Sequence, residues 1–201
     1  MMATIYEQIY QFKISLNDIE PSIWRCIEVQ ANYSFWDLHV AIQDSMGWLD
    51  CHLHEFNIMN PTTGEKESIG IPDENSGFSA SLKISPGWET KIADYFSEKT
   101  KQALYTYDFG DSWEHTVQLE KILPREAGIK YPRCIDGKRA CPPEDCGSIP
   151  GYERLIEIMQ NPGDEEYESM LDWLGFHYDP EAFTTKIRFS NPKTRLKNLS
   201  A

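Results

Sequence analysis

The sequence lacks any long apolar run, since no stretch of about 18 uncharged apolar residues occurs in its 201 residues. Its N-terminus also lacks the basic segment followed by an apolar one that marks a secretory signal. These absences predict a cytoplasmic protein that does not contact the membrane. The five cysteines are an odd number, which in such a chain argues against a disulfide framework and for reduced thiols or metal ligands.

Short enzyme signatures are missing as well: there is no glycine-rich phosphate loop, nucleotide fingerprint, nucleophile elbow or metalloprotease helix. Positive charge is also scarce, and the net charge of −13 disfavours nucleic acid as a partner. An exception is residues 182–201, which carry five basic residues and no acid. This basic tail could contact DNA, or it could be a solvated terminus.

Length and composition predict a single domain over residues 1–201, with a core at 5–180 and the basic tail at 181–201. Apolar and polar residues alternate over 10–16 and 23–29, which predicts an antiparallel hairpin. Ser34 can cap a helix over 35–46, and Gly47 is placed to end it.

Further strands are expected at 52–59 and 65–71, and residues 72–88 have the composition of a loop. Residues 103–107 and 114–122 flank an acidic turn and should form a second hairpin. Helical spacing recurs at 151–160 and 164–174. The predicted fold is α+β, a mostly antiparallel sheet with helices packed on it.

Three cysteines, Cys134, Cys141 and Cys146, lie close together after the second hairpin. Their spacing is looser than that of a typical zinc knuckle, and a closed tetrahedral site would need a fourth ligand. His115, on the preceding strand, is our first choice. A structural zinc is therefore the candidate cofactor, and simple packing of the thiols in a loop is the alternative.

Two further groups could carry chemistry. His52 and His54 would point to one face of a strand and could share a metal, or simply form a hydrogen-bonded pair. The acidic turn and the stiff segment after Cys141 supply acids for a divalent cation or a general base. The candidate catalytic residues are Asp111, His115, Glu144 and Asp145, with Asp108 and Glu114 beside them. Asp108 and Gly110 also suit a tight turn without any catalytic role.

Several motifs in order resemble the plasmid pRiA4b ORF-3-like family: PSIWR at 21–25, MGW at 46–48, HLHEF at 52–56, YDFGDSWEH at 107–115 and RACPPEDCG at 139–147. The resemblance covers roughly residues 5 to 180. It implies an association with mobile elements, in which some members are labelled resolvase-like. That label should not be inherited, because this acidic chain lacks a basic DNA-binding region and a serine surrounded by arginines.

Three functions follow. The leading hypothesis is a protein- or ligand-binding module with a structural zinc. It uses the acidic turn and the segment that carries Cys134, Cys141 and Cys146, which we call the cysteine loop. The second is a metal-dependent hydrolase or nuclease-like enzyme that uses the acids named above. The third is a mobile-element accessory protein that contacts DNA through the basic tail. The sequence leaves open whether the protein is an enzyme.

Overall fold

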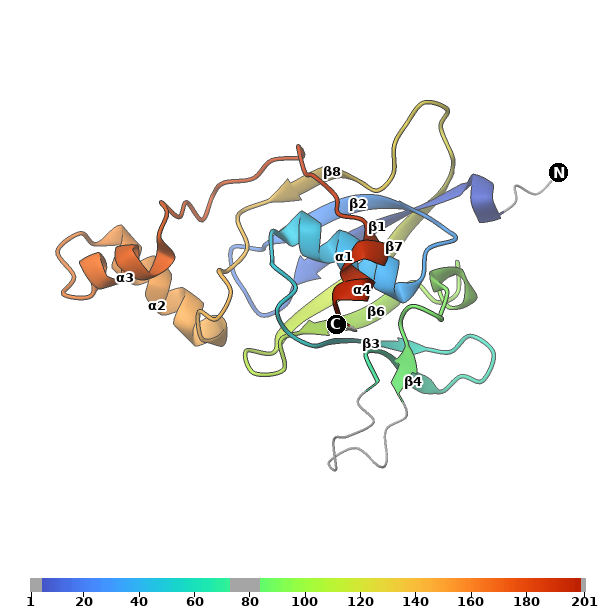
Figure 1. Ribbon diagram of the computed structural model, residues 1–201, viewed down its shortest axis with the longest axis horizontal. Coiled ribbons are helices and arrows are strands. Elements are labelled where there is room, and N and C mark those ends of the chain that lie inside the picture. Colours follow the sequence, from blue (N-terminus) through green and yellow to red (C-terminus); the bar gives the residue numbers. More distant parts are fainter. Residues whose placement is uncertain (1–4, 73–83, 200–201) are drawn as a thin grey trace.

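The computed structural model describes residues 5–72 and 84–199 and has an α+β fold. One eight-stranded sheet runs in the order β5-β4-β3-β6-β7-β1-β2-β8 (Figure 1). All neighbouring strands are antiparallel except β4 and β5, which confirms the predicted mostly antiparallel sheet. The strands are β1 (Gln8–Leu16), β2 (Trp24–Gln30), β3 (His54–Met59), β4 (Lys66–Gly70), β5 (Ile84–Pro86), β6 (Gln102–Tyr107), β7 (Trp113–Pro124) and β8 (Arg133–Lys138).

Both predicted hairpins are present. Strands β1 and β2 pair antiparallel, with Tyr10 opposite Val29. Strands β6 and β7 pair across the acidic turn, with Tyr107 opposite Trp113. In that turn Asp108 and Ser112 adopt positive φ angles of 55° and 57°, and the Asp108 carboxylate accepts a hydrogen bond from the Gly110 amide. Local turn chemistry therefore fixes the register of the two central strands.

Helix α1 (Phe35–Met46) begins and ends at the residues that the sequence predicts. Ser34 and Asp37 form a reciprocal capping box, and Gly47 ends the helix with a φ of 94°. One side of α1 faces the sheet, and α4 (Pro192–Leu199) lies over its opposite side (Figure 1). The helix is consequently buried nearly all round, in agreement with the many buried residues along it.

The main core fills the space between α1 and the sheet. The Phe35 ring of the helix packs edge-on against Phe56 of β3, with ring centroids 5.1 Å apart. It stacks on the Phe96 ring, with centroids 6.0 Å apart. Phe12 of β1 and Tyr105 of β6 extend this aromatic layer and are fully buried. Full burial of each such ring contributes roughly 1.5–3 kcal/mol, so this layer is the chief anchor of α1 on the sheet.

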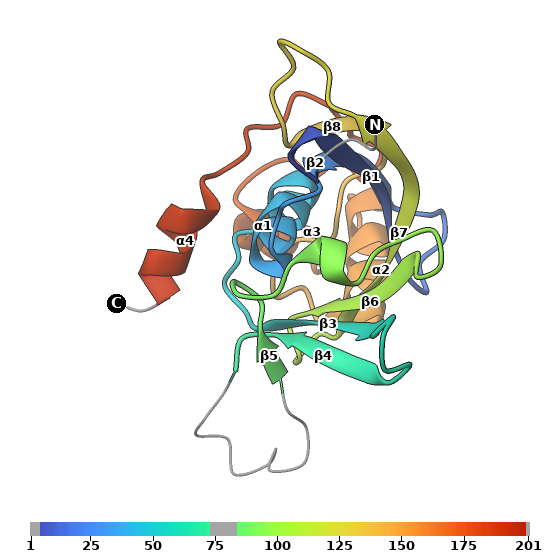
Figure 2. The ribbon, with the colours of Figure 1, turned by 90° about the vertical axis from the view of Figure 1, so that its right-hand side faces the viewer.

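Helices α2 (Ser148–Gln160) and α3 (Tyr167–Leu174) contact each other beside the sheet (Figures 1 and 2). Tyr152, Leu155 and Leu174 are buried and join the main core. The prediction that the helices as a group pack on the sheet is thus not confirmed, although α1 does contact it. Two short 3-10 turns, at Ile5–Glu7 and Ile92–Asp94, complete the elements.

Apart from the 3-10 turns, the elements that the sequence does not predict are β5, β8 and α4. Strand β5 falls in the expected loop at 72–88, of which 73–83 lie outside the described residues. Strand β8 falls after the second predicted hairpin, where no element is expected, and α4 falls in the basic tail. Among the residues that the structure describes, no helix has the length and apolar character that crossing a membrane requires.

Candidate functional site

The acidic turn, the start of β3 and the cysteine loop converge at one end of the sheet. Strand β3 pairs with β6 so that His54 lies opposite Tyr107, which places His52 and Asp108 side by side just beyond the paired residues. The Asp108 amide donates a hydrogen bond to the Leu53 carbonyl at 3.0 Å and closes this corner. The register of these two strands therefore brings two separate sequence motifs together.

Three carboxylates surround the His52 imidazole. Its Nε2 lies 3.1 Å from Asp145, 3.6 Å from Asp108 and 4.0 Å from Glu144. We call these four residues the rim cluster. The His52 side chain is 28% exposed and that of Asp145 is 71% exposed, so the cluster opens to solvent. One ligand atom each from His52, Asp108 and Asp145 lies within 4.8 Å of the others, a spacing suited to a divalent cation.

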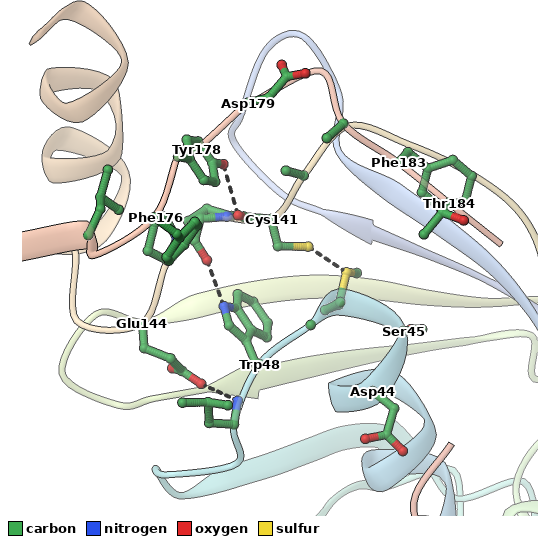
Figure 3. A pocket seen from close by; sticks show the side chains of 18 of the residues that line it. Asp44, Ser45, Trp48, Cys141, Glu144, Phe176, Tyr178, Asp179, Phe183 and Thr184 are labelled. Carbon is green, nitrogen blue, oxygen red and sulfur yellow. Dashed lines mark hydrogen bonds between the residues drawn. The ribbon is translucent and has the colours of Figure 1, made fainter. Parts of the chain in front are cut away.

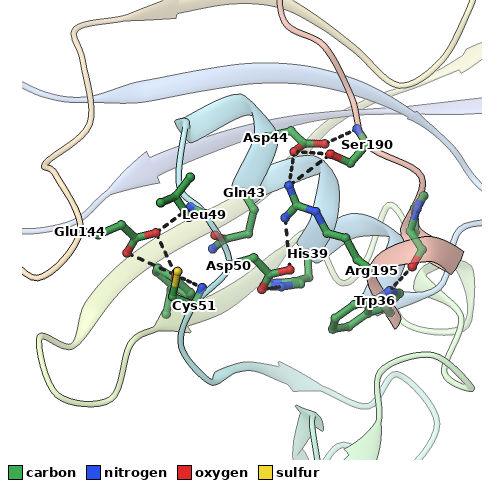
Figure 4. Close-up of polar contacts among 12 residues, drawn as sticks. Trp36, His39, Gln43, Asp44, Leu49, Asp50, Cys51, Glu144, Ser190 and Arg195 are labelled. Carbon is green, nitrogen blue, oxygen red and sulfur yellow. Dashed lines mark hydrogen bonds and ion pairs between the residues drawn. The ribbon is translucent and has the colours of Figure 1, made fainter. Parts of the chain in front are cut away.

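Glu144 is held by the protein around it. Its carboxylate accepts a hydrogen bond from the Leu49 amide at 2.7 Å (Figure 4). It accepts another from the Tyr107 hydroxyl at 3.1 Å. The Tyr107 hydroxyl in turn accepts from the Cys51 amide at 3.0 Å. Burial, and next the Glu144 charge, raise the pKa of Tyr107, which keeps this phenol protonated as a donor.

Asp108 and Asp145 both have left-handed backbone conformations, each with a φ of 55°. Such a conformation costs a residue other than glycine roughly 1–2 kcal/mol, less for aspartate. Backbone strain of this kind gathers at functional sites, where the surrounding structure holds it in place. Among the three possible metal ligands His52, Asp108 and Asp145, the two aspartates therefore have a strained backbone.

The four predicted zinc ligands do not assemble. No three of Cys134, Cys141, Cys146 and His115 place their ligand atoms within 4.8 Å of one another, although all four are described. The Cys141 thiol lies 3.1 Å from the Met46 sulfur, and that of Cys134 donates to the Asp136 carbonyl. Burial raises the pKa of Cys141 to about 11 and that of Cys146 to about 12, which disfavours the thiolate.

Trp48 keeps His115 apart from the cysteine loop. The imidazole is fully buried, and its ring centroid lies 5.2 Å from that of the Trp48 indole. On the other side, the indole N–H donates to the Pro142 carbonyl at 2.9 Å. The loop does fold back on the sheet as expected, but its carboxylates meet His52 and not His115. Zinc binding itself stays a prediction.

The remaining catalytic candidates separate into two groups. Glu144 and Asp145 belong to the rim cluster together with Asp108. Asp111 accepts a hydrogen bond from the Gly147 amide at 3.1 Å and so ties the turn to the loop before α2. Glu114 lies on β7 opposite Thr106, outside the cluster. The sequence also marks His52 as a candidate ligand, but the strand pattern pairs it with His54 and not with these acids.

A cleft of about 940 Å³ opens beside the rim cluster and shares Glu144 and Asp145 with it. It lies between three segments: the end of α1 with the loop that follows (44–49), the cysteine loop (140–145) and the segment from the end of α3 onward (173–187) (Figure 3). Its walls are formed mainly by apolar side chains: Met46, Trp48, Leu49, Pro142, Pro143, Trp173, Leu174, Phe176, Tyr178, Phe183 and Ile187. The MGW and RACPPEDCG motifs supply two of the walls, but no single motif marks the cleft, because its walls come from three distant segments.

The cysteine loop forms one wall of the cleft and is fixed from both sides. The Tyr178 hydroxyl donates to the Cys141 carbonyl at 2.9 Å, and the Trp48 indole N–H donates to the Pro142 carbonyl (Figure 3). Arg25 is buried at the base, where its guanidinium donates to the Ser45 carbonyl at 2.8 Å and lies 4.9 Å from the Phe183 ring. The cleft is therefore largely pre-formed.

Part of the basic tail contacts acidic residues of the same chain. Arg195 contacts Asp44 at 2.5 Å and Asp50 at 3.1 Å, and the Ser190 amide donates to Asp44. The Trp36 indole N–H donates to the Pro192 carbonyl at 2.9 Å. DNA contact through this tail stays a prediction, with Arg195 already paired to acids.

Comparisons with known proteins cover the sheet, the rim cluster and the cleft. The family described as plasmid pRiA4b ORF-3-like protein matches residues 8–186. A Sinorhizobium fredii protein, described as uncharacterized protein y4hQ, is 30% identical over 167 residues, 83% of this chain and 81% of its own length. The crystal structure of MM3350 from Methanosarcina mazei Go1, a protein of unknown function, is 46% identical and aligns with a TM-score of 0.84 over 92% of this chain and 99% of that one.

Proposed function

The chain belongs to the plasmid pRiA4b ORF-3-like family, and we propose that it is a binding module whose cleft takes a basic, apolar peptide segment of a partner protein. The single observation that carries this proposal is the composition of the cleft, which has apolar walls and carboxylates at its rim. A volume of about 940 Å³ lies within the range of ligand-binding clefts.

Exposed apolar side chains at the cleft supply the driving force. Leu49 is 73% exposed, Phe176 58% and Trp173 49%. Large apolar side chains gathered on a surface commonly mark an interaction site. Covering one of them with a partner side chain would contribute roughly 1.5–3 kcal/mol, and charge contacts at the rim would add to this apolar contribution.

Charge selects the kind of partner. Glu144, Asp145 and Asp179 line the cleft, and the whole chain carries a net charge of −13. This field attracts lysine and arginine side chains and repels acidic segments. The expected ligand therefore places an aromatic or aliphatic side chain between the walls and a basic one against Glu144 or Asp145.

Paired peptide libraries test this proposal. Both libraries hold the same apolar residues, but one is flanked by lysine and arginine and the other by aspartate and glutamate. Basic peptides should bind, more weakly as salt increases, and acidic ones should not. Phe176→Ser should weaken binding at least tenfold, whereas Phe109→Ser, an equally exposed residue outside the cleft, should not. Equal binding of both libraries, or equal effects of both substitutions, would contradict it.

A metal-dependent hydrolase is the second candidate, favoured by the close ligand atoms of His52, Asp108 and Asp145 beside the cleft. A cation there would keep open positions for a water and a substrate, because Asp145 is exposed. Phosphoester and peptide substrates should then be cleaved only with added manganese or magnesium, and Asp108→Asn should abolish the activity. A flat response to metal across the substrates would remove this candidate.

A further inference from the structure

Two carboxylates of the rim cluster have one oxygen held by a backbone amide and turn the other toward His52. Oδ1 of Asp108 accepts a hydrogen bond from the Gly110 amide at 2.9 Å, and Oδ2 lies 3.6 Å from the His52 Nε2. In Glu144, Oε1 accepts from the Leu49 amide at 2.7 Å, and Oε2 lies 4.0 Å from the same nitrogen. Such outer partners orient carboxylates in the way that metal sites require.

The His52 nitrogen between these oxygens makes no hydrogen bond. Its Nε2 is buried and lacks a hydrogen-bond partner among the residues that the structure describes, although an Asp145 oxygen lies 3.1 Å away. Three carboxylate oxygens thus lie near this nitrogen, but none of them lies where a hydrogen bond from it would point. Leaving such a group unsatisfied costs roughly 1–3 kcal/mol. A cation bound jointly by the nitrogen and the oxygens would remove that cost.

We propose that the rim cluster binds a divalent transition-metal ion of the zinc class, and that this ion competes with the basic side chain of the peptide for the cleft. Ligand atoms of His52, Asp108 and Asp145 lie within 4.8 Å of one another. Glu144 is placed to accept a hydrogen bond from a water on the ion. An imidazole among the ligands favours zinc and its first-row neighbours over calcium and magnesium, which take mainly oxygen ligands.

The competition rests on the proposed peptide-binding function, because the two ligands share residues. Glu144 and Asp145 line the cleft and also belong to the rim cluster, so a lysine or arginine bound there occupies the place of the ion. A divalent ion also neutralises two of the three carboxylate charges, which weakens the attraction of a second cation. Linkage makes the effect reciprocal: the peptide lowers the affinity for the ion by the same factor.

Zinc alone tests the metal site. The full chain is stripped with chelator and titrated by calorimetry with zinc and with magnesium. One equivalent of zinc should bind, more tightly than magnesium, and Asp108→Asn should weaken zinc binding by more than about tenfold. Asparagine tolerates the left-handed backbone and keeps an oxygen for the Gly110 amide, so this variant should fold, which circular dichroism checks. Glu114→Gln removes the same charge from the same hairpin outside the cluster, and should bind zinc like the wild type.

Three results would overturn the metal site. They are failure of the stripped chain to bind zinc, zinc binding no tighter than magnesium binding, and zinc binding that persists unchanged in both Asp108→Asn and His52→Gln.

A basic peptide from the paired libraries tests the competition. Saturating zinc should weaken its binding to the wild type at least tenfold, whereas in Asp108→Asn the affinities with and without the same zinc concentration should be equal. Zinc binding that leaves the peptide affinity of the wild type unchanged would overturn the competition. If no basic peptide binds the metal-free chain, the proposed function fails and the competition with it, while the zinc titration decides the metal site independently.

Discussion

His52 and His54 are separated by one residue, yet they lie in opposite environments. His52 precedes β3 and faces three carboxylates at the mouth of the cleft. His54 is the first residue of β3 and faces another imidazole and aromatic rings in the interior. The strand begins between them, so the register of β3, and not residue type, assigns each imidazole to its cluster.

The first consequence of this comparison concerns stability, and the largest effect should come from the interior residues around His54, which include His39 and Asp50. His39→Ala should lower the free energy of unfolding by about 4 kcal/mol, because it leaves Asp50 and the Tyr105 hydroxyl without their partner. His52→Ala, at the open rim, should cost less than about 1 kcal/mol. Urea unfolding at pH 7.5 measures both. Similar losses would show that the two environments do not differ as described.

A buried imidazole should also make the protein acid-sensitive. Burial lowers the pKa of His115 to about 4 from an ordinary value of 6.5. Between these values the unfolded chain binds a proton that the folded chain does not, so stability falls as the pH drops from about 6.5 to about 4. The full difference corresponds to about 3 kcal/mol.

His115→Gln removes this dependence and tests its origin. The difference in unfolding free energy between wild type and variant should shrink as the pH is lowered through that window. Chemical denaturation at pH 7, 6 and 5 measures it. A difference that stays constant with pH would place the acid sensitivity elsewhere.

Arg195 connects the tail to Asp44 at the end of α1 and to Asp50 on the loop that follows. Its guanidinium contacts Asp44 and Asp50 and is 21% exposed, so Arg195→Ala should cost about 2 kcal/mol. Hydrogen exchange in α4 should rise at the same time. Lys197→Ala, an exposed residue on the same helix, serves as the control and should change neither quantity. Unchanged exchange in Arg195→Ala would mean that the helix is held by other contacts.

The smallest predicted change is an increase in stability, and it concerns Asp145 of the rim cluster. Asp145 has a φ of 55°, which glycine adopts without strain. Asp145→Gly should therefore stabilise the fold by up to about 1 kcal/mol, while it weakens binding of basic peptides to the cleft. Asp145→Ala removes the same carboxylate but keeps the strain, and should not stabilise the fold. Thermal unfolding and peptide titration separate the two effects.

Local patterns were sufficient to predict much of the sheet and α1. Ser34, Asp37 and Gly47 fix the helix ends through contacts within a few residues, and the acidic turn fixes the β6–β7 hairpin in the same way. Strand β8 was missed because it is an edge strand with few apolar residues, formed by pairing with β2. Helix α4 was missed because long-range contacts of Arg195 hold it, and its own sequence is polar.

Only those parts of the candidate site that lie close together in the sequence could be predicted. The sequence predicts that the turn and the cysteine loop are neighbours, and the structure brings their carboxylates together. Nearness along the chain favours His115 as their imidazole, whereas the pairing of β3 with β6 brings His52 to these carboxylates. The cleft could not be predicted, since its walls come from three segments that only the complete fold assembles.

The contacts of α4 bear on how this protein should be cut for expression. The family match ends at residue 186, ahead of Ser190, Pro192 and Arg195. A fragment trimmed to that boundary would uncover the Trp36 indole and leave Asp44 and Asp50 without their counter-charge. Such a fragment would be less soluble and less stable than the full chain, so an expressed fragment should extend through α4.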